Sequence, residues 1–132
     1  MDSIISNKNY QVQLFLDSGK GFIEEESIKE LYKNGQLIYK FDITKYIKQN
    51  IFLLRLDPLD ESCVISIDYS YLIDESGMES ELKFQYSNAD IFNKMMYFAN
   101  KDPQIYYSIS NTSKKSGFVC AFFKINYHYC NI

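Results

Sequence analysis

The chain contains no tryptophan, one arginine, one histidine and two prolines in 132 residues. Because prolines are few and glycines number five, it is not a low-complexity or disordered chain. A zinc site needs more cysteine and histidine ligands than His128 and three scattered cysteines offer. No Ser–His–Asp or Cys–His arrangement is indicated around His128, which we expect to lie in a C-terminal tail. We therefore expect no metal, no cofactor and no catalytic centre.

Other absences bear on location and partners. No apolar run approaches the ~20 residues of a membrane helix, and the N-terminus lacks the basic start and apolar centre of a signal peptide. Cys63, Cys120 and Cys130 form no CxxC pair, which favours a reducing, cytoplasmic compartment. The net charge is −3 without a basic stripe, so we expect no nucleic-acid partner. Because no long apolar run is present, we expect no membrane insertion either.

Aromatic side chains, by contrast, are abundant. They make up 17% of the sequence, with 12 tyrosines and 10 phenylalanines, and hydrophobic residues make up 46%. Aromatic and β-branched side chains favour the half-buried, pleated surface of a sheet. A chain of this length forms one domain around a single core. We expect an N-terminal tail at residues 1–9, one β-sandwich domain at residues 10–127 and a C-terminal tail at residues 128–132.

Apolar and polar residues alternate along most of the chain, which is the pattern of half-buried strands. Turn residues separate the alternating segments, as in a sandwich or barrel. The expected fold is an all-β, jelly-roll-like antiparallel β-sandwich of roughly seven to nine strands with at most short helical turns. The segments that carry the pattern are Tyr10–Leu16, Gln36–Phe41, Ile51–Leu56, Cys63–Ile73, Glu81–Tyr86, Gln104–Ser110 and Phe118–Tyr127.

Alternation also assigns each side chain to a face of its strand. It directs Tyr69, Tyr71 and Tyr86 into the core. It directs Tyr106 outward, because the inward positions of that segment are Ile105, Tyr107 and Ile109. The large apolar residues expected on outer faces are Phe15, Phe118 and Phe122.

Three segments allow more than one structure. Residues 24–33 fit a helix that ends at Gly35, and residues 88–100 fit a helix that Asn88 caps. Either segment can instead be a strand or a loop, because periodicity does not decide between them over such short runs. A short helical turn over residues 43–48, capped by Asp42, is also compatible with the sequence.

Several polar motifs resemble functional sites only superficially. The segment Asp17–Gly21 lacks the spacing of a phosphate-binding loop and is typical of a β-turn. The carboxylates of Glu24–Glu26 cannot share one face of a strand, so a solvated acidic run is expected. Acidic residues near loops match no calcium-loop spacing and are interpreted as ordinary acidic turns. These residues are Asp57, Asp60, Glu61 and Asp74.

Arg55 is the only arginine. Its plausible partners are Asp57, Asp60 and Asp68, because a guanidinium forms a two-pronged hydrogen-bonded pair with a carboxylate. The same geometry also serves direct ligand contact, so Arg55 is both a structural and a ligand-binding candidate.

Tyrosines are the best indication of function. A tyrosine ring stacks on the apolar face of a sugar while its hydroxyl makes a hydrogen bond. Tyr106 is the first candidate for carbohydrate contact, with Tyr97 and Asp102 close to it in the sequence. Most tyrosines in such a chain are nevertheless expected to be core or sheet-surface residues.

The order of four segments resembles one known family. They are VQLFLDSGKGFIEEESI (12–28), LRLDPLD (54–60), VISI (64–67) and DPQI (102–105). The chain is similar, over residues 10–127, to the accessory β-sandwich module inside large bacterial glycosyltransferases for surface-polysaccharide synthesis. That module is of the galactose-binding-like or jelly-roll type. The resemblance implies that residues 25–33 are extended, that Met96–Asn100 pairs with Gln104–Ile109, and that the module is non-catalytic.

The expected function is therefore a non-catalytic accessory module that contacts carbohydrate through Tyr106, Tyr97, Asp102 and Arg55. Its partners would be carbohydrate or the neighbouring catalytic domains. One alternative is a structural spacer that docks catalytic domains, for which an exposed apolar patch is expected. Another is a small sugar-acting enzyme, which needs two carboxylates converging in a cleft.

Overall fold

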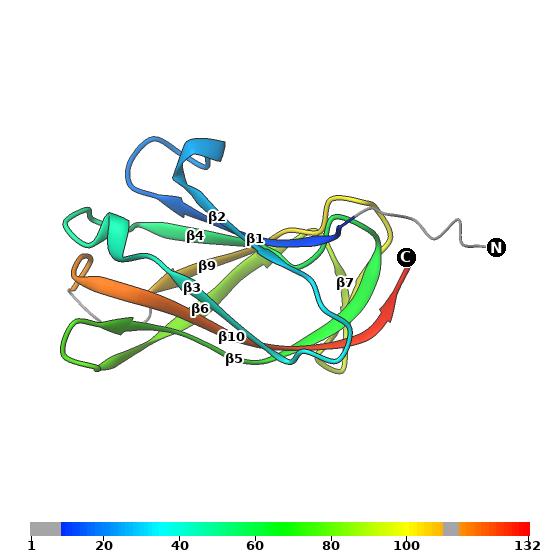
Figure 1. The fold of residues 1–132 in the computed structure, drawn as a ribbon. Helices are drawn as coiled ribbons and strands as arrows, with labels where there is room; N and C mark the ends of the chain where they lie inside the picture. Colours follow the sequence, from blue (N-terminus) through cyan, green and yellow to red (C-terminus); the bar gives the residue numbers. More distant parts are fainter. Residues whose placement is uncertain (1–8, 110–113) are drawn as a thin grey trace.

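Within the described residues, 9–109 and 114–132, ten strands form two antiparallel layers that pack face to face (Figure 1). This computed structural model is therefore an all-β sandwich, with one strand more than the predicted range. The first layer, sheet A, has the order β2 (Ser27–Leu31), β1 (Gln11–Asp17), β4 (Leu53–Asp57), β9 (Ile105–Ile109) and β6 (Glu79–Ser87). The second layer, sheet B, contains β5 (Cys63–Asp74), β10 (Phe118–Cys130), β3 (Ile38–Asp42), β7 (Asp90–Phe92) and β8 (Met95–Phe98).

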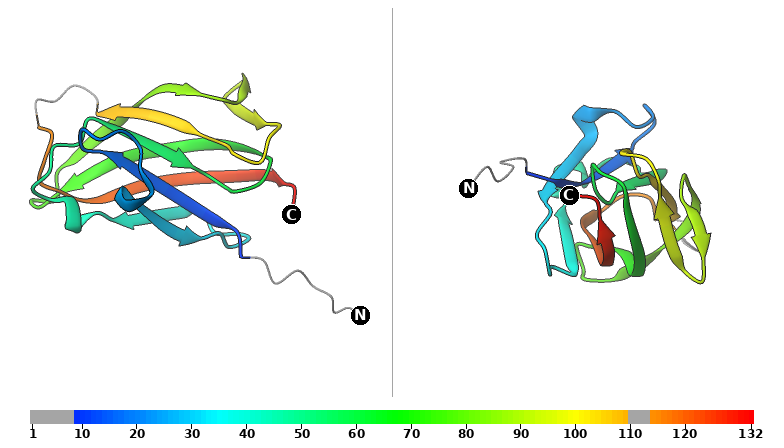
Figure 2. Two further views of the ribbon diagram at one scale, coloured as in Figure 1. Left: turned by 90° about the horizontal axis from the view of Figure 1, so that it is seen from above. Right: turned by 90° about the vertical axis from the view of Figure 1, so that its right-hand side faces the viewer.

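Strand β6 joins the two layers. Its first residues, 79–81, pair with β5 in sheet B, and residues 82–87 pair with β9 in sheet A. On the opposite side of the sandwich, the edge strands β2 and β3 approach each other (Figure 2). The core is therefore enclosed along both sides as well as above and below.

The core is apolar and follows the predicted alternation most closely on β1 and β9. Tyr107 of sheet A lies 5.8 Å from Phe123 of sheet B between ring centroids, so the layers meet through aromatic contacts. Full burial of one large apolar side chain contributes about 1.5–3 kcal/mol. The residues predicted to point inward from these two strands are all buried, namely Val12, Leu14, Leu16, Ile105, Tyr107 and Ile109.

Irregular pairing between β5 and β10 reverses several predicted faces. Register shifts interrupt this pair near Asp68 and Val119. An extra residue in one strand moves the side chains that follow it to the other face. Tyr69 is consequently 60% exposed, Tyr71 lies on the outer face, and Phe118 is 1% exposed in the core. The inward predictions for Tyr69 and Tyr71 and the outward prediction for Phe118 are therefore wrong.

The helical alternatives resolve into short pieces. Residues 24–26 form a 3-10 turn, η1, that leads into strand β2, so no helix spans residues 24–33. A second 3-10 turn, η2 (Thr44–Tyr46), confirms the predicted short turn. Asp42 Oδ1 accepts hydrogen bonds from the backbone nitrogen and the hydroxyl of Thr44 at 3.0 and 2.6 Å.

Residues 88–100 contain the hairpin of β7 and β8 instead of a helix. Asn93 and Lys94 form its turn with φ values of 50° and 66°, the positive values that favour a tight hairpin turn. Strand β8 pairs with β7 and with β5, so the expected pairing with residues 104–109 is wrong. Residues 105–109 instead form strand β9, which lies between β4 and β6 in sheet A.

Near its C-terminus the chain remains in the sheet. Strand β10 continues to Cys130, and His128 lies in this strand with Nε2 2.9 Å from Ser66 Oγ. Of the expected N-terminal tail, only Asn9 is among the described residues. None of the helices in the described part of the chain has the length and apolar character needed to cross a bilayer.

Candidate functional site

Four side chains from neighbouring strands form a row across the outer face of sheet A. Phe15 on β1 is opposite Arg55 on β4, Arg55 is opposite Tyr106 on β9, and Tyr106 is opposite Tyr86 on β6. Directly opposite residues share a face and have Cβ atoms about 4.5–5.5 Å apart. We call these four residues the outer row. It places an arginine and three aromatic rings side by side.

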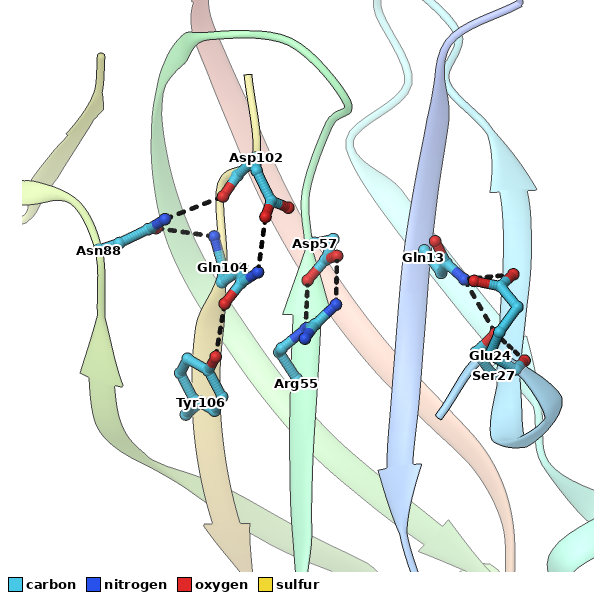
Figure 3. Close-up of polar contacts among 9 residues, drawn as sticks. All are labelled: Gln13, Glu24, Ser27, Arg55, Asp57, Asn88, Asp102, Gln104 and Tyr106. Carbon is cyan, nitrogen blue, oxygen red and sulfur yellow. Dashed lines mark hydrogen bonds and ion pairs between the residues drawn. The ribbon is translucent and has the colours of Figure 1, made fainter. Parts of the chain in front are cut away.

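Arg55 is held on two sides within the outer row. Its Nε and Nη2 atoms donate hydrogen bonds to the two carboxylate oxygens of Asp57 at 2.9 and 3.0 Å (Figure 3). Its guanidinium carbon lies 4.0 Å from the centroid of the Phe15 ring. Asp57 is thus the partner among the three predicted carboxylates, and the arrangement indicates a structural role for Arg55.

Asp57 is an unusual carboxylate because little of it reaches water. Its side chain is 14% exposed and that of Arg55 is 17% exposed. Burial raises the pKa of Asp57 to about 6, and the Arg55 guanidinium acts in the opposite direction. The negative charge of Asp102 adds to the increase, so the two acidic groups lie in the same region.

A chain of polar side chains extends from the outer row along the start of β9. The Tyr106 hydroxyl donates to Gln104 Oε1 at 2.5 Å, and the Gln104 amide donates to Asp102 Oδ2 at 2.9 Å. Asn88 closes the chain, because its amide nitrogen donates to the Asp102 carbonyl and its Oδ1 accepts from the Gln104 backbone (Figure 3). We call Tyr106, Gln104, Asp102 and Asn88 the polar chain. Its hydrogen bonds fix the direction of each donor and acceptor.

The loop between β1 and β2 contributes one more aromatic ring. Asp17 Oδ1 accepts hydrogen bonds from the backbone nitrogens of Gly19 and Gly21 at 2.8 and 3.0 Å, which confirms the predicted turn. The loop brings Phe22 to 5.6 Å from the Tyr106 ring and 5.8 Å from the Arg55 guanidinium carbon. Phe15 is on the outer face as predicted, but beneath Arg55 it is only 6% exposed.

The acidic run after this loop is not wholly solvated. Glu26 is 7% exposed, and both of its carboxylate oxygens accept from the Ser18 hydroxyl at 2.8 and 2.9 Å. Glu24 remains exposed and accepts from the Gln13 amide at 3.1 Å (Figure 3). The prediction of a solvated acidic run is therefore wrong at Glu26, because the 3-10 turn directs that side chain into a buried position.

The acidic residues considered for calcium are engaged separately. Asp60 accepts from the Gln11 backbone at 3.1 Å, and Asp74 accepts from Ser76 and the Met78 backbone. Over residues 9–109 and 114–132, no three His, Cys, Asp or Glu side chains are grouped as a metal site requires.

The structure brings together three of the four predicted site residues. Arg55, Tyr106 and Asp102 lie on the same side of sheet A, within the outer row or the polar chain. Tyr97 does not join them, because β8 places it opposite Val64 in sheet B. Tyr86 was predicted to face the core, but a register shift between Phe84 and Tyr86 turns its ring outward and brings it to the site. The sequence prediction missed Gln104, which alternation would have placed on the face of Tyr106.

Comparisons of the chain with protein-family models, curated proteins and solved structures found no match. The resemblance to the glycosyltransferase module therefore stays a prediction. The outer row and the polar chain are the parts of the described structure that indicate a function.

Proposed function

We propose that this domain is a non-catalytic module that contacts carbohydrate through the exposed end of the outer row. The observation that carries the proposal is the contact between Tyr86, which is 62% exposed, and Tyr106, with ring centroids 5.8 Å apart. The polar chain begins at the hydroxyl of Tyr106. The exposed aromatic surface of Tyr86 therefore lies beside the oriented hydrogen-bonding groups of the polar chain.

Sugars match this combination of groups. A pyranose ring has an apolar face of C–H groups that stacks on an aromatic ring, and hydroxyls around its edge. Tyr86 would provide the stacking surface. The Asp102 carboxylate would accept hydrogen bonds from sugar hydroxyls, and the Gln104 amide would donate to them. Arg55 would act indirectly, since its fork with Asp57 and its contact with Phe15 hold the middle of the row.

A binding role fits these residues better than a hydrolytic one. Glycoside hydrolysis needs two carboxyl groups on either side of the scissile bond. Asp57 uses both carboxylate oxygens to hold Arg55 and lies largely buried. The link to a bacterial glycosyltransferase for surface polysaccharides, and the cytoplasmic location, depend on the sequence resemblance and on cysteine usage.

Calorimetric titration with bacterial polysaccharide fragments tests the proposal. Tyr86→Ala should abolish or strongly weaken binding, because stacking on one ring contributes much of the affinity for a sugar. Tyr69→Ala is the matched control, since Tyr69 is 60% exposed on the opposite face of the sandwich. Equal loss in both variants, or unchanged binding in Tyr86→Ala, would contradict the proposal.

A docking surface for a neighbouring domain is the second candidate. Phe84 and Ile91 border an apolar depression of about 290 Å³ between β5, β6 and β8, and Phe92 on the same hairpin is 70% exposed. Exposed apolar groups of this kind are common at interaction surfaces. Phe92→Ser should then weaken association with the neighbouring domain and leave any carbohydrate binding unchanged.

A further inference from the structure

Two of the three cysteines lie directly opposite each other on adjacent strands. Cys63 begins β5 and Cys130 ends β10, and the antiparallel register pairs them. Both are free thiols. The sequence separates them widely and offers no CxxC motif, so only the strand pairing reveals the contact.

The hydrogen bonds around this pair define its type. The backbone nitrogen of Asn131 donates to the carbonyl of Ser62 at 3.0 Å, one residue outside the pair on each strand. This pattern belongs to a non-hydrogen-bonded pair, in which the Cα atoms are about 4.5 Å apart and the side chains are close. Disulfides span Cα separations of about 4.4–6.8 Å. The backbone can therefore accommodate a bond between the two sulfur atoms.

Both thiols also point to the same side of sheet B. Cys63 is 1% exposed in the core, and Cys130 is half-buried against that core. Cys130 Sγ lies 3.6 Å from the Tyr32 hydroxyl. Cys130 is the thiol that solvent can reach, and Cys63 is the thiol beneath it.

We infer that Cys63 and Cys130 form an oxidative modification site that closes into a cross-strand disulfide on reaction with a small-molecule disulfide such as oxidised glutathione. This inference is independent of the proposed function. The reacting group is the pair of thiols, and the more exposed thiol, Cys130, reacts first.

The reaction has two exchange steps. Cys130 loses its proton and attacks one sulfur of oxidised glutathione, which forms a mixed disulfide and releases one glutathione thiol. Cys63 then loses its proton and attacks the Cys130 sulfur, which releases the second glutathione thiol. Two protein thiols are oxidised and one glutathione disulfide is reduced to two thiols.

The environment makes this exchange slow at neutral pH. Burial raises the pKa of Cys63 to about 12, and burial also raises the pKa of Cys130 while its hydrogen bond with Tyr32 acts in the opposite direction. Because the thiolate is the nucleophile, the rate should increase steeply between pH 7 and 9. Once formed, the bond would tie the end of β10 to the start of β5. It should raise the thermal unfolding midpoint by roughly 10 °C.

The full chain incubated with oxidised glutathione, followed by mass spectrometry of intact protein and peptides, tests the inference. The expected product has lost two hydrogens, retains one free thiol at Cys120, and contains a cross-linked peptide that joins Cys63 to Cys130. Dithiothreitol should reverse the change.

Matched variants separate this reaction from general thiol oxidation. Cys120→Ser should give the same cross-link, because Cys120 lies opposite Asp42 and Ile73 instead of another cysteine. Cys63→Ser should stop at a glutathione adduct on Cys130. A stable glutathione adduct on Cys130 in the wild type, a disulfide that includes Cys120, or a dimer linked between chains would overturn the inference. The wild-type peptide map decides the question even if a variant folds poorly.

Discussion

The two outer faces of the sandwich both carry aromatic rings beside cations, but they hold the cation differently. On sheet A, Arg55 lies over Phe15 and forms a fork with Asp57, and its side chain is 17% exposed. On sheet B, Lys40 and Lys124 lie 5.9 and 5.8 Å from the rings of Phe122 and Tyr69, with no buried carboxylate partner among the described residues. The sheet A cation is fixed by its surroundings, and the sheet B cations remain accessible to water.

This difference explains why the candidate site lies on sheet A. A binding surface is more effective when its groups already have their final orientation, since less conformational freedom is lost on binding. Arg55 and the members of the polar chain meet that condition through side-chain hydrogen bonds. The sheet B face has the stacked pair Tyr71 and Phe122, with ring centroids 4.7 Å apart. Its polar contacts are more exposed, since Asp68 accepts from Asn126 at 2.9 Å and lies 3.7 Å from Lys124 with its side chain 41% exposed.

Removing the two cations should give the largest contrast between the faces. Arg55→Ala leaves Asp57 buried without its partner and should cost about 3–5 kcal/mol of unfolding free energy. Lys124→Ala removes an exposed pair with Asp68 and should cost less than about 1 kcal/mol. Urea denaturation of both variants measures these free energies. Similar losses in the two variants would show that the Arg55 fork is no more stabilising than a surface pair.

Two carboxylates, one in each sheet, should respond to pH in opposite directions. Burial raises the pKa of Asp57 on sheet A from 3.8 to about 6. The folded state therefore binds the Asp57 proton more tightly than the unfolded state does. As pH falls from 7 to 4, the wild type should gain stability relative to Asp57→Asn. Denaturation curves across this range measure the difference, and a constant difference would contradict the raised pKa.

Asp74 at the end of β5 should respond in the opposite direction. Hydrogen bonds from Ser76, Met78 and Lys114 lower its pKa to about 2. Its stabilising contribution is therefore present above pH 4 and is lost as pH falls towards 2. The advantage of the wild type over Asp74→Asn should shrink in that window. A difference that stays constant or grows on acidification would refute this explanation.

The smallest expected effect on stability comes from Tyr86→Ala. The ring is 62% exposed, so its removal should change the unfolding free energy by less than about 1 kcal/mol. Thermal denaturation measures the change. A large destabilisation would indicate that Tyr86 is part of the fold instead of a free binding surface.

Much of this architecture could be predicted from alternation alone, but not all of it. Regular strands such as β1 and β9 follow a period of two, so their inward residues were predicted correctly. Alternation fails where one strand has an extra residue, which is why Tyr69 and Tyr86 were assigned to the wrong face. The partner of Arg55 was among the predicted carboxylates, because Asp57 lies two positions further along the same strand.

The pairing of strands that are far apart in the chain could not be predicted from the sequence. Tyr97 is near Tyr106 in the chain, but β8 pairs with β5 and separates the two residues into different sheets. The cysteine pair could not be predicted for the same reason, because only the register of β5 and β10 brings Cys63 and Cys130 opposite each other.

A chemical-shift map of the folded domain during titration with bacterial polysaccharide fragments tests the proposed carbohydrate site directly. We predict that the largest shifts fall on the amides of Tyr86, Gln104 and Tyr106, at the exposed end of the outer row. Shifts centred instead on Tyr69, Tyr71 and Phe122, or no saturable shifts with any fragment, would contradict a carbohydrate site on sheet A.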